Sequence, residues 1–165
     1  MTAKTFVGFG FGPIQSALFL YEAFRSGHFS RFVIAEVDAG VVQAVRAAGG
    51  RYTINIALPG RIEQATITGV ELYNPAVPED RQQILQAIAD SDELATSLPS
   101  VAFFDKGKET SVARTLADGL SLRSAARPAV IYTAENHNHA AEILGEAVAK
   151  YCAPAVLQNV QFLNR

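Results

Sequence analysis

Residues 6–19, FVGFGFGPIQSALF, decide the fold that we expect for this chain. The stretch begins with the apolar residues of a buried strand, passes three glycines in five positions, and then reaches Pro13 and an amphipathic run. Proline suits the first turn of a helix, because its missing N–H leaves no intrahelical hydrogen bond unmade. Gly27 stands where that helix is expected to end. The stretch therefore predicts a strand, a glycine turn and a helix in direct succession.

The same alternation continues along the chain. An apolar segment at 31–36 predicts a second strand, and Gly49 and Gly50 stop the helix that follows it. Two β-rich segments between residues 52 and 72 flank a Leu-Pro-Gly turn and predict an excursion from the alternation. Uninterrupted apolar strands joined by helices are typical of a parallel sheet that is covered on both faces. We therefore expect an α/β fold, a Rossmann-type doubly wound, mostly parallel sheet with a β-rich excursion after the second helix. Later helices are expected at 78–89, 111–122 and 139–151, and later strands at 93–97 and from 128 onward.

The composition excludes several classes of protein. With 165 residues, 49% of them hydrophobic, the chain has the size of one domain. A formal charge of −2 offers no broad basic surface to a nucleic acid. Cys152 is the single cysteine, which rules out an internal disulfide and a zinc site made of several thiolates. The chain has no secretory signal and no run of ~20 apolar residues, so we expect a cytoplasmic protein that contacts neither nucleic acid nor membrane.

The glycine turn is suited to bind an anion. A turn that leads from a parallel strand into a helix presents unpaired backbone N–H groups and the positive end of the helix dipole. Gly8 and Gly10 match two of the three glycines in the dinucleotide fingerprint G-x-G-x-x-G, whereas Pro13 holds the third position. We therefore expect the pyrophosphate of a dinucleotide to lie against this turn. The expected contacts are Gly8, Gly10, Gly12, Ile14 and Gln15.

An acidic residue is expected to select the sugar of that dinucleotide. In dinucleotide folds an acid at the end of the second strand, about 20 residues past the glycines, accepts hydrogen bonds from the adenosine ribose. Glu36 ends the apolar segment 24 residues after Gly12 (36 − 12 = 24). Its carboxylate would repel the 2′-phosphate of NADP, so NAD is the expected cofactor. Asp38 is the competing acid, and in the simplest alternative the glycines only shape a turn and Glu36 is a solvated strand end.

Other glycine motifs fit less well. A Walker loop requires a lysine after its glycines, and a kinase loop requires a strand lysine and an HRD-like segment, neither of which is present. The G-x-G-x-G spacing of S-adenosylmethionine-dependent methyltransferases matches the turn. The acid that these enzymes usually carry two residues before the first glycine is replaced here by Phe6. The methyltransferase stays open as an alternative.

Polar residues follow the apolar strand that begins at Pro128. The segment 133–139, TAENHNH, lies where open α/β sheets bind ligands. On a helix His137 and His139 would diverge by about 200°, which disfavours a metal site. Asn136 or Asn138 can equally be a helix cap.

These features together resemble mannitol-1-phosphate dehydrogenases and related long-chain polyol dehydrogenases. The resemblance rests on the glycine turn, the strand that ends in Glu36, Tyr52 in GGRYTINI and TAEN at 133–136, and it extends through GVELYNP, ATSLPSVAF and VQFLN. It implies hydride transfer between NAD and a secondary alcohol of a polyol or polyol phosphate. It also implies that Asn136 is a catalytic hydrogen-bond donor to the substrate oxygen. On the nicotinamide side, the implied contacts are Thr96, Ser97 and Ser100.

The resemblance further implies a domain boundary. Residues 1–160 would be the NAD-binding domain, and 161–165 would begin a helical catalytic domain that packs on it and carries a lysine as general base. We therefore expect this chain to bind NAD weakly and to turn over nothing alone. His137 and His139 depart from the residues common in that family, which leaves the substrate preference open. The non-enzymatic alternative is a free-standing nucleotide-sensing module.

Overall fold

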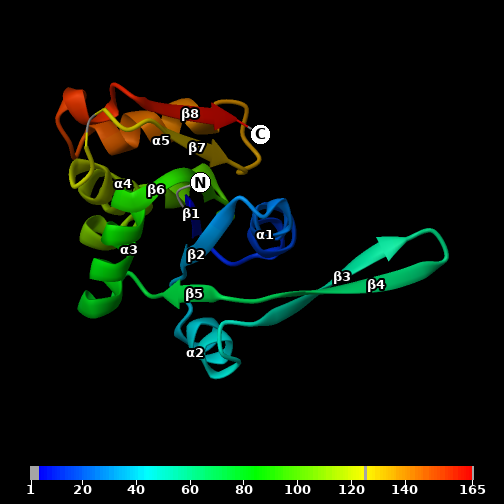
Figure 1. Ribbon diagram of the computed structural model, residues 1–165. Coiled ribbons are helices and arrows are strands. Elements are labelled where there is room, and N and C mark those ends of the chain that lie inside the picture. Colours follow the sequence, from blue (N-terminus) through cyan, green and yellow to red (C-terminus); the bar gives the residue numbers. More distant parts are fainter. Residues whose placement is uncertain (1–3, 125, 165) are drawn as a thin grey trace.

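A six-stranded sheet forms the centre of the protein (Figure 1). The computed structural model describes residues 4–124 and 126–164. The strands lie in the order β5-β2-β1-β6-β7-β8, and every neighbouring pair is parallel. The Rossmann-type α/β fold expected from the sequence is therefore confirmed. The strands of this sheet are β1 (Lys4–Phe9), β2 (Phe29–Ala35), β5 (Val70–Tyr73), β6 (Ser91–Thr96), β7 (Ala129–Thr133) and β8 (Val160–Asn164).

Helices cover both faces because the side chains of a buried strand alternate between them. On β2, Phe32 and Ile34 pack in one apolar cluster with Leu20, whereas Val33 packs in a second cluster with Ile84. Helices α1 and α2 contribute to the first cluster, and α3, α4 and α5 contribute to the second. The helices are α1 (Leu20–Ser26), α2 (Ala39–Ala47), α3 (Pro78–Asp90), α4 (Val112–Ser121) and α5 (Ala140–Ala149), with short 3-10 turns at Val101–Phe103, Lys108–Thr110 and Pro154–Leu157.

The helix boundaries follow the sequence signals, with one irregularity. Gln15–Phe19 form a π-helical turn that continues directly into α1. α1 ends at Gly27, and α2 ends just before Gly49 and Gly50, as predicted. None of the described helices is both long and apolar enough to span a membrane.

The β-rich excursion is a hairpin that leaves the body of the protein. Strands β3 (Tyr52–Leu58) and β4 (Arg61–Ile67) pair with each other in antiparallel register, and Figure 1 shows them projecting beyond the sheet. The second β-rich segment of the sequence, which ends at residue 72, is divided between β4 and β5. Gly69 lies between them with φ of +73°, and this left-handed residue redirects the chain into the main sheet.

Residues 160–164 complete the sheet, since β8 pairs in parallel with β7 over its full length. Asn164 also caps α5: its Oδ1 accepts the N–H of Ala141, 23 residues earlier, at 2.8 Å. Its Nδ2 donates to the carbonyl of Asn138 at 3.0 Å. The sequence predicted Asn136 or Asn138 as the cap of this helix. In the structure Asn164, from β8, caps it instead. The helical domain expected from 161 onward stays a prediction.

Candidate functional site

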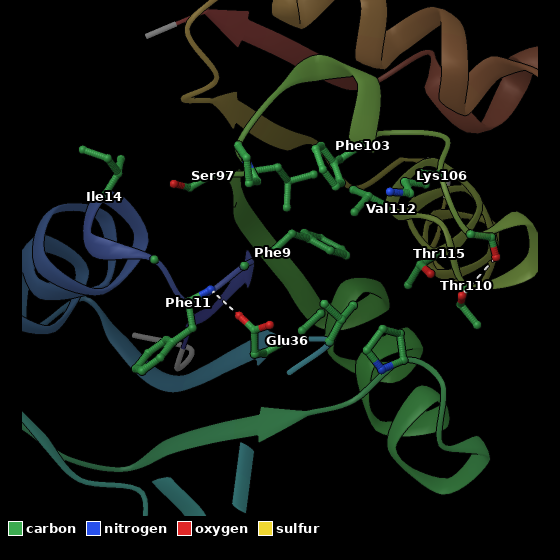
Figure 2. A pocket seen from close by; sticks show the side chains of 18 of the residues that line it. Phe9, Phe11, Ile14, Glu36, Ser97, Phe103, Lys106, Thr110, Val112 and Thr115 are labelled. Atoms are coloured by element: carbon green, nitrogen blue, oxygen red, sulfur yellow. Dashed lines mark hydrogen bonds between the residues drawn. The ribbon is translucent and has the colours of Figure 1, made fainter. Parts of the chain in front are cut away.

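A cavity of about 690 Å³ opens at the carboxyl ends of β1, β2 and β6. From β1 the chain runs outward to β2 and β5, and it then returns to β6 on the other side of β1. Open α/β sheets bind ligands at this switch point, and the volume lies in the usual range for small-molecule sites. Figure 2 shows Phe11 and Glu36 on one side of the cavity, with Phe103, Lys106 and Val112 on the other.

The glycine turn forms one side of the cavity and is held by its backbone. The N–H of Gly10 donates to the carbonyl of Ala35 at 2.9 Å, which joins the turn to β2. Gly10 has φ of +82°, and a Cβ there would lie 2.8 Å from the carbonyl oxygen of Ser97. Glycine is therefore required for the close approach of the turn to the segment after β6. Gly12 differs, because a Cβ there would meet nothing within 4 Å.

The chain after Gly12 presents free backbone donors. The carbonyl of Gly12 accepts two hydrogen bonds from Ser16, one from its N–H at 2.9 Å and one from its hydroxyl at 3.0 Å. These bonds fix the first turn of the helix, whose leading N–H groups have no intrahelical acceptor. Because Pro13 has no N–H, Ile14 and Gln15 supply the donors of this turn. Together with the helix dipole, they favour an anion at this end of the helix.

Glu36 follows β2 and faces the cavity. Its Oε2 accepts the N–H of Phe11 at 2.7 Å, and its Oε1 accepts the N–H of Asp38 at 2.8 Å (Figure 2). A carboxylate can accept further hydrogen bonds beyond these two. Asp38 instead caps α2, because its Oδ1 accepts the N–H groups of Gly40 at 2.8 Å and Val41 at 3.2 Å. Of these two acids, Glu36 is the one that lines the cavity.

The cavity brings together part of the set of residues predicted from the sequence. Those that line it are Gly10, Gly12, Ile14, Glu36 and Ser97. Those that lie outside its lining are Gly8, Gln15, Thr96, Ser100 and Asn136.

The side chain of Gln15 is packed beneath the glycine turn. It is fully buried, and neither its Oε1 nor its Nε2 has a hydrogen-bond partner among the described residues. A Cβ on Gly8 would lie 2.3 Å from that Nε2. Gly8 therefore leaves room for the side chain of Gln15, which is turned into the core.

Glu135 holds the segment that follows β6. This buried carboxylate accepts the hydroxyl of Thr96 through Oε2 at 2.9 Å and the N–H of Leu98 through Oε1 at 2.7 Å. The hydroxyl of Thr96 is thereby engaged in a hydrogen bond within the protein. Ser100 caps the following 3-10 turn and accepts the N–H of Ala102 at 3.2 Å. Both predicted contacts thus shape the loop that carries Ser97.

The polar segment after β7 is exposed. The side chains of Asn136, His137 and His139 lie at the surface, and the two imidazole rings are 6.2 Å apart. Over residues 4–124 and 126–164, no group of three or more His, Cys, Asp or Glu side chains is placed to hold a metal ion.

Several lining residues were not found by sequence reasoning. Phe9 is the last residue of β1, and the rule that ligands bind at strand ends could have indicated it. Phe103 ends a 3-10 turn, Lys106 lies in the loop that follows it, and Thr115 belongs to α4. No spacing rule links such positions to a strand end. Lys106 places its Nζ 4.8 Å from the ring centroid of Phe103 and is the one cation among the described lining residues.

No family model and no curated protein matches this chain. Among solved structures, it is similar to a dipicolinate synthase polypeptide from Bacillus halodurans, with 7% identity, a TM-score of 0.48, and coverage of 99% of this chain and 39% of that one. It is also similar to an imine reductase from Aspergillus terreus in complex with NADPH4, with 16% identity, a TM-score of 0.45, and coverage of 93% and 39%. The RCK domain of GsuK gives 16% identity, a TM-score of 0.49, and coverage of 93% and 26%. The chain thus spans well under half the length of these proteins, and at these identities the similarity is one of fold alone.

Proposed function

We propose that this chain is a nucleotide-binding domain that takes NAD in the cavity at the switch point. One observation carries the proposal: the open first turn at Gly12 and Ile14 and the carboxylate of Glu36 border the same cavity. Free N–H groups at a helix N-terminus suit a pyrophosphate, and an acid at the end of the second strand suits the ribose hydroxyls.

The wall of the cavity supports this assignment. Its lining beyond Glu36 includes Val37, Pro75 and Val112, an apolar surface of the kind that an adenine ring requires. A 2′-phosphate on the ribose would meet the negative charge of Glu36. Lys106, the cation among the described lining residues, comes from the far wall (Figure 2). These charges favour NAD over NADP.

The chemistry that we propose is that of an NAD-dependent oxidoreductase acting on a CH–OH group of a polyol or polyol phosphate. When bound, the nicotinamide supplies or accepts the hydride. Asn136 would donate a hydrogen bond to the substrate oxygen and stabilise the charge that develops there. A helical domain packed against this one would supply the general base, so this chain alone binds cofactor without turnover. The family resemblance supports these finer assignments.

Isothermal titration calorimetry with NADH, NADPH and S-adenosylmethionine tests the proposal. We expect NADH to bind at least about tenfold more tightly than NADPH, a difference of about 1.4 kcal/mol. We expect no heat from S-adenosylmethionine and no oxidation of mannitol or mannitol 1-phosphate. Binding of S-adenosylmethionine without NADH would establish the methyltransferase alternative. NADH binding by a full-length protein that oxidises no alcohol would favour the sensing module.

A further inference from the structure

Tyr52, at the base of the hairpin, contacts the glycine turn without lining the cavity. Its hydroxyl donates to the carbonyl of Ser16, 36 residues earlier, at 2.6 Å. Its ring packs edge-on against the ring of Phe11, with centroids 5.0 Å apart and an interplanar angle of 79°. Phe11 precedes Gly12 and Ser16 follows it. Tyr52 therefore contacts the glycine turn on both sides of Gly12.

The hydroxyl of Tyr52 is the outer member of a chain of hydrogen bonds that ends at Gly12. Tyr52 donates to Ser16, and Ser16 in turn donates twice to the Gly12 carbonyl, through its N–H and its hydroxyl. Ser16 lies in the π-helical turn, a geometry that helices adopt rarely and often at functional sites. The hydroxyl of Tyr52 comes from outside this helix and donates to the Ser16 carbonyl. It therefore stabilises the first turn of the helix, whose N–H groups would face the pyrophosphate.

The bond is partly buried. Tyr52 is partly buried, and this burial raises the pKa of its hydroxyl, which stays a proton donor throughout the neutral range.

We propose that Tyr52 is a positioning residue for nucleotide binding, which holds the first turn of the helix in the form that receives a pyrophosphate. The inference rests on the proposed function. It makes the base of the hairpin a part of the cofactor site, although β3 and β4 line none of the cavity. A ligand that lacks the pyrophosphate should not depend on this residue.

Tyr52→Phe tests the inference, because it keeps the ring against Phe11 and removes only the hydroxyl. Tyr132→Phe is the matched control: its ring stacks on Phe19 with centroids 6.1 Å apart, and its hydroxyl has no hydrogen bond within residues 4–124 and 126–164. NADH affinity is measured by fluorescence titration, adenosine affinity by NMR titration, and the opening of residues 10–16 by amide hydrogen exchange.

We expect Tyr52→Phe to weaken NADH binding by about three- to tenfold, because the turn loses a partly buried hydrogen bond that holds it in its binding form. Hydrogen exchange at residues 10–16 should accelerate, and the affinity for adenosine should not change. Tyr132→Phe should match the wild type in all three measurements. Replacing Tyr52 by para-aminophenylalanine keeps a donor at the same place and should restore most of the affinity for NADH.

Two results would overturn the inference while leaving the proposed function intact. In the first, Tyr52→Phe lowers the melting temperature but binds NADH as the wild type does. In the second, the affinities for NADH and adenosine fall together. Failure of the wild-type chain to bind NADH would instead refute the proposed function, and the inference with it, before any substitution is made. Should Tyr52→Phe not fold, the para-aminophenylalanine variant decides. NADH affinity and exchange at residues 10–16 that both stay near the wild type, or that change together, support the inference, and a change in one without the other overturns it.

Discussion

The carboxylate of Glu36 accepts the backbone N–H of Phe11 at 2.7 Å, and this bond ties the end of β2 to the glycine turn. The same carboxylate borders the cavity, so one side chain both shapes the turn and faces the space where a ligand would lie. A change at Glu36 therefore acts on the geometry of the turn and on the charge of the cavity together.

Glu36→Gln should weaken NADH binding by about ten- to a hundredfold, because hydrogen bonds to a charged group contribute about 1.5–3 kcal/mol. The preference for NADH over NADPH should shrink, since the negative charge is gone. Asp38→Asn is the control, because asparagine caps a helix as well as aspartate does. Fluorescence titration of both variants decides between the two acids. A loss of NADH affinity in Asp38→Asn but not in Glu36→Gln would contradict the assignment.

Gly12→Ala should weaken ligand binding, whereas Gly10→Ala should lower the stability of the protein. A methyl group at Gly12 meets no protein atom, so the free energy of unfolding should stay within about 0.5 kcal/mol of the wild type. That methyl group would occupy ligand space, and we expect about tenfold weaker NADH binding, or about 1.4 kcal/mol. Gly10→Ala should destabilise the protein by about 1–3 kcal/mol, because alanine is strained at φ of +82° and meets Ser97. Denaturant unfolding and NADH titration separate the two effects, and equal destabilisation by both would count against this geometry.

Gln15→Met should stabilise the protein. The buried amide of Gln15 has no partner among the described residues, and an unsatisfied buried polar group costs about 1–3 kcal/mol. Methionine fills a similar volume without that cost, so the midpoint of urea unfolding should rise. NADH affinity should stay near the wild-type value if only the backbone N–H of Gln15 binds the ligand. A clear loss of affinity would show that the side chain reaches the pyrophosphate after all.

The ion pair between β2 and β5 should make the stability sensitive to acid. Arg31 hydrogen-bonds both oxygens of Glu71 at 2.9 Å, and these bonds hold the pKa of Glu71 below its ordinary value of 4.5. A carboxyl whose pKa is lower in the folded state contributes stability above its unfolded pKa and loses it as the pH falls through the folded pKa. Glu71→Gln should therefore cost about 1 kcal/mol or less at pH 7, and the difference should vanish well below pH 4. Urea unfolding at several pH values measures it.

The control for that titration is Glu63→Gln, which removes an exposed ion pair with Arg61 on the hairpin. Exposed pairs contribute little, so this variant should follow the wild-type curve at every pH. A difference between the wild type and Glu71→Gln that persists undiminished into acid would show that the carboxyl is not what Arg31 stabilises.

Local signals in the sequence predicted the scaffold. The apolar run before Gly8, the proline at the start of the first helix and the glycines at the ends of α1 and α2 each act within a few residues, so periodicity and turn chemistry reveal them. From the same signals, the sequence predicted one β-rich segment where the structure has parts of two strands, β4 and β5. Both are β-rich, and Gly69 lies between β4 in the hairpin and β5 in the main sheet.

Contacts between residues far apart in the sequence, which hold the fold and the borders of the cavity, could not be predicted in this way. Tyr52 reaches Ser16, Glu135 reaches Thr96, and Asn164 caps α5 from a strand 23 residues further along the chain. No spacing rule predicts a partner at such separations. The position of Gln15 in the sequence predicted a donor to the ligand. In the structure its side chain is packed into the core, which local sequence signals do not reveal.

The pairing of β1 with β6 also governs when the cavity can exist during synthesis. Val7, in the middle of β1, lies opposite Leu94, so this inner strand gains its second neighbour only after residue 94 has left the ribosome. The opposite wall, at Val112 and Thr115, emerges later still. Because pairings between distant segments form slowly, a nascent chain released before that point would carry the glycine turn without a pocket. A cavity that can receive a ligand therefore forms only after β6 and α4 have packed beside the glycine turn.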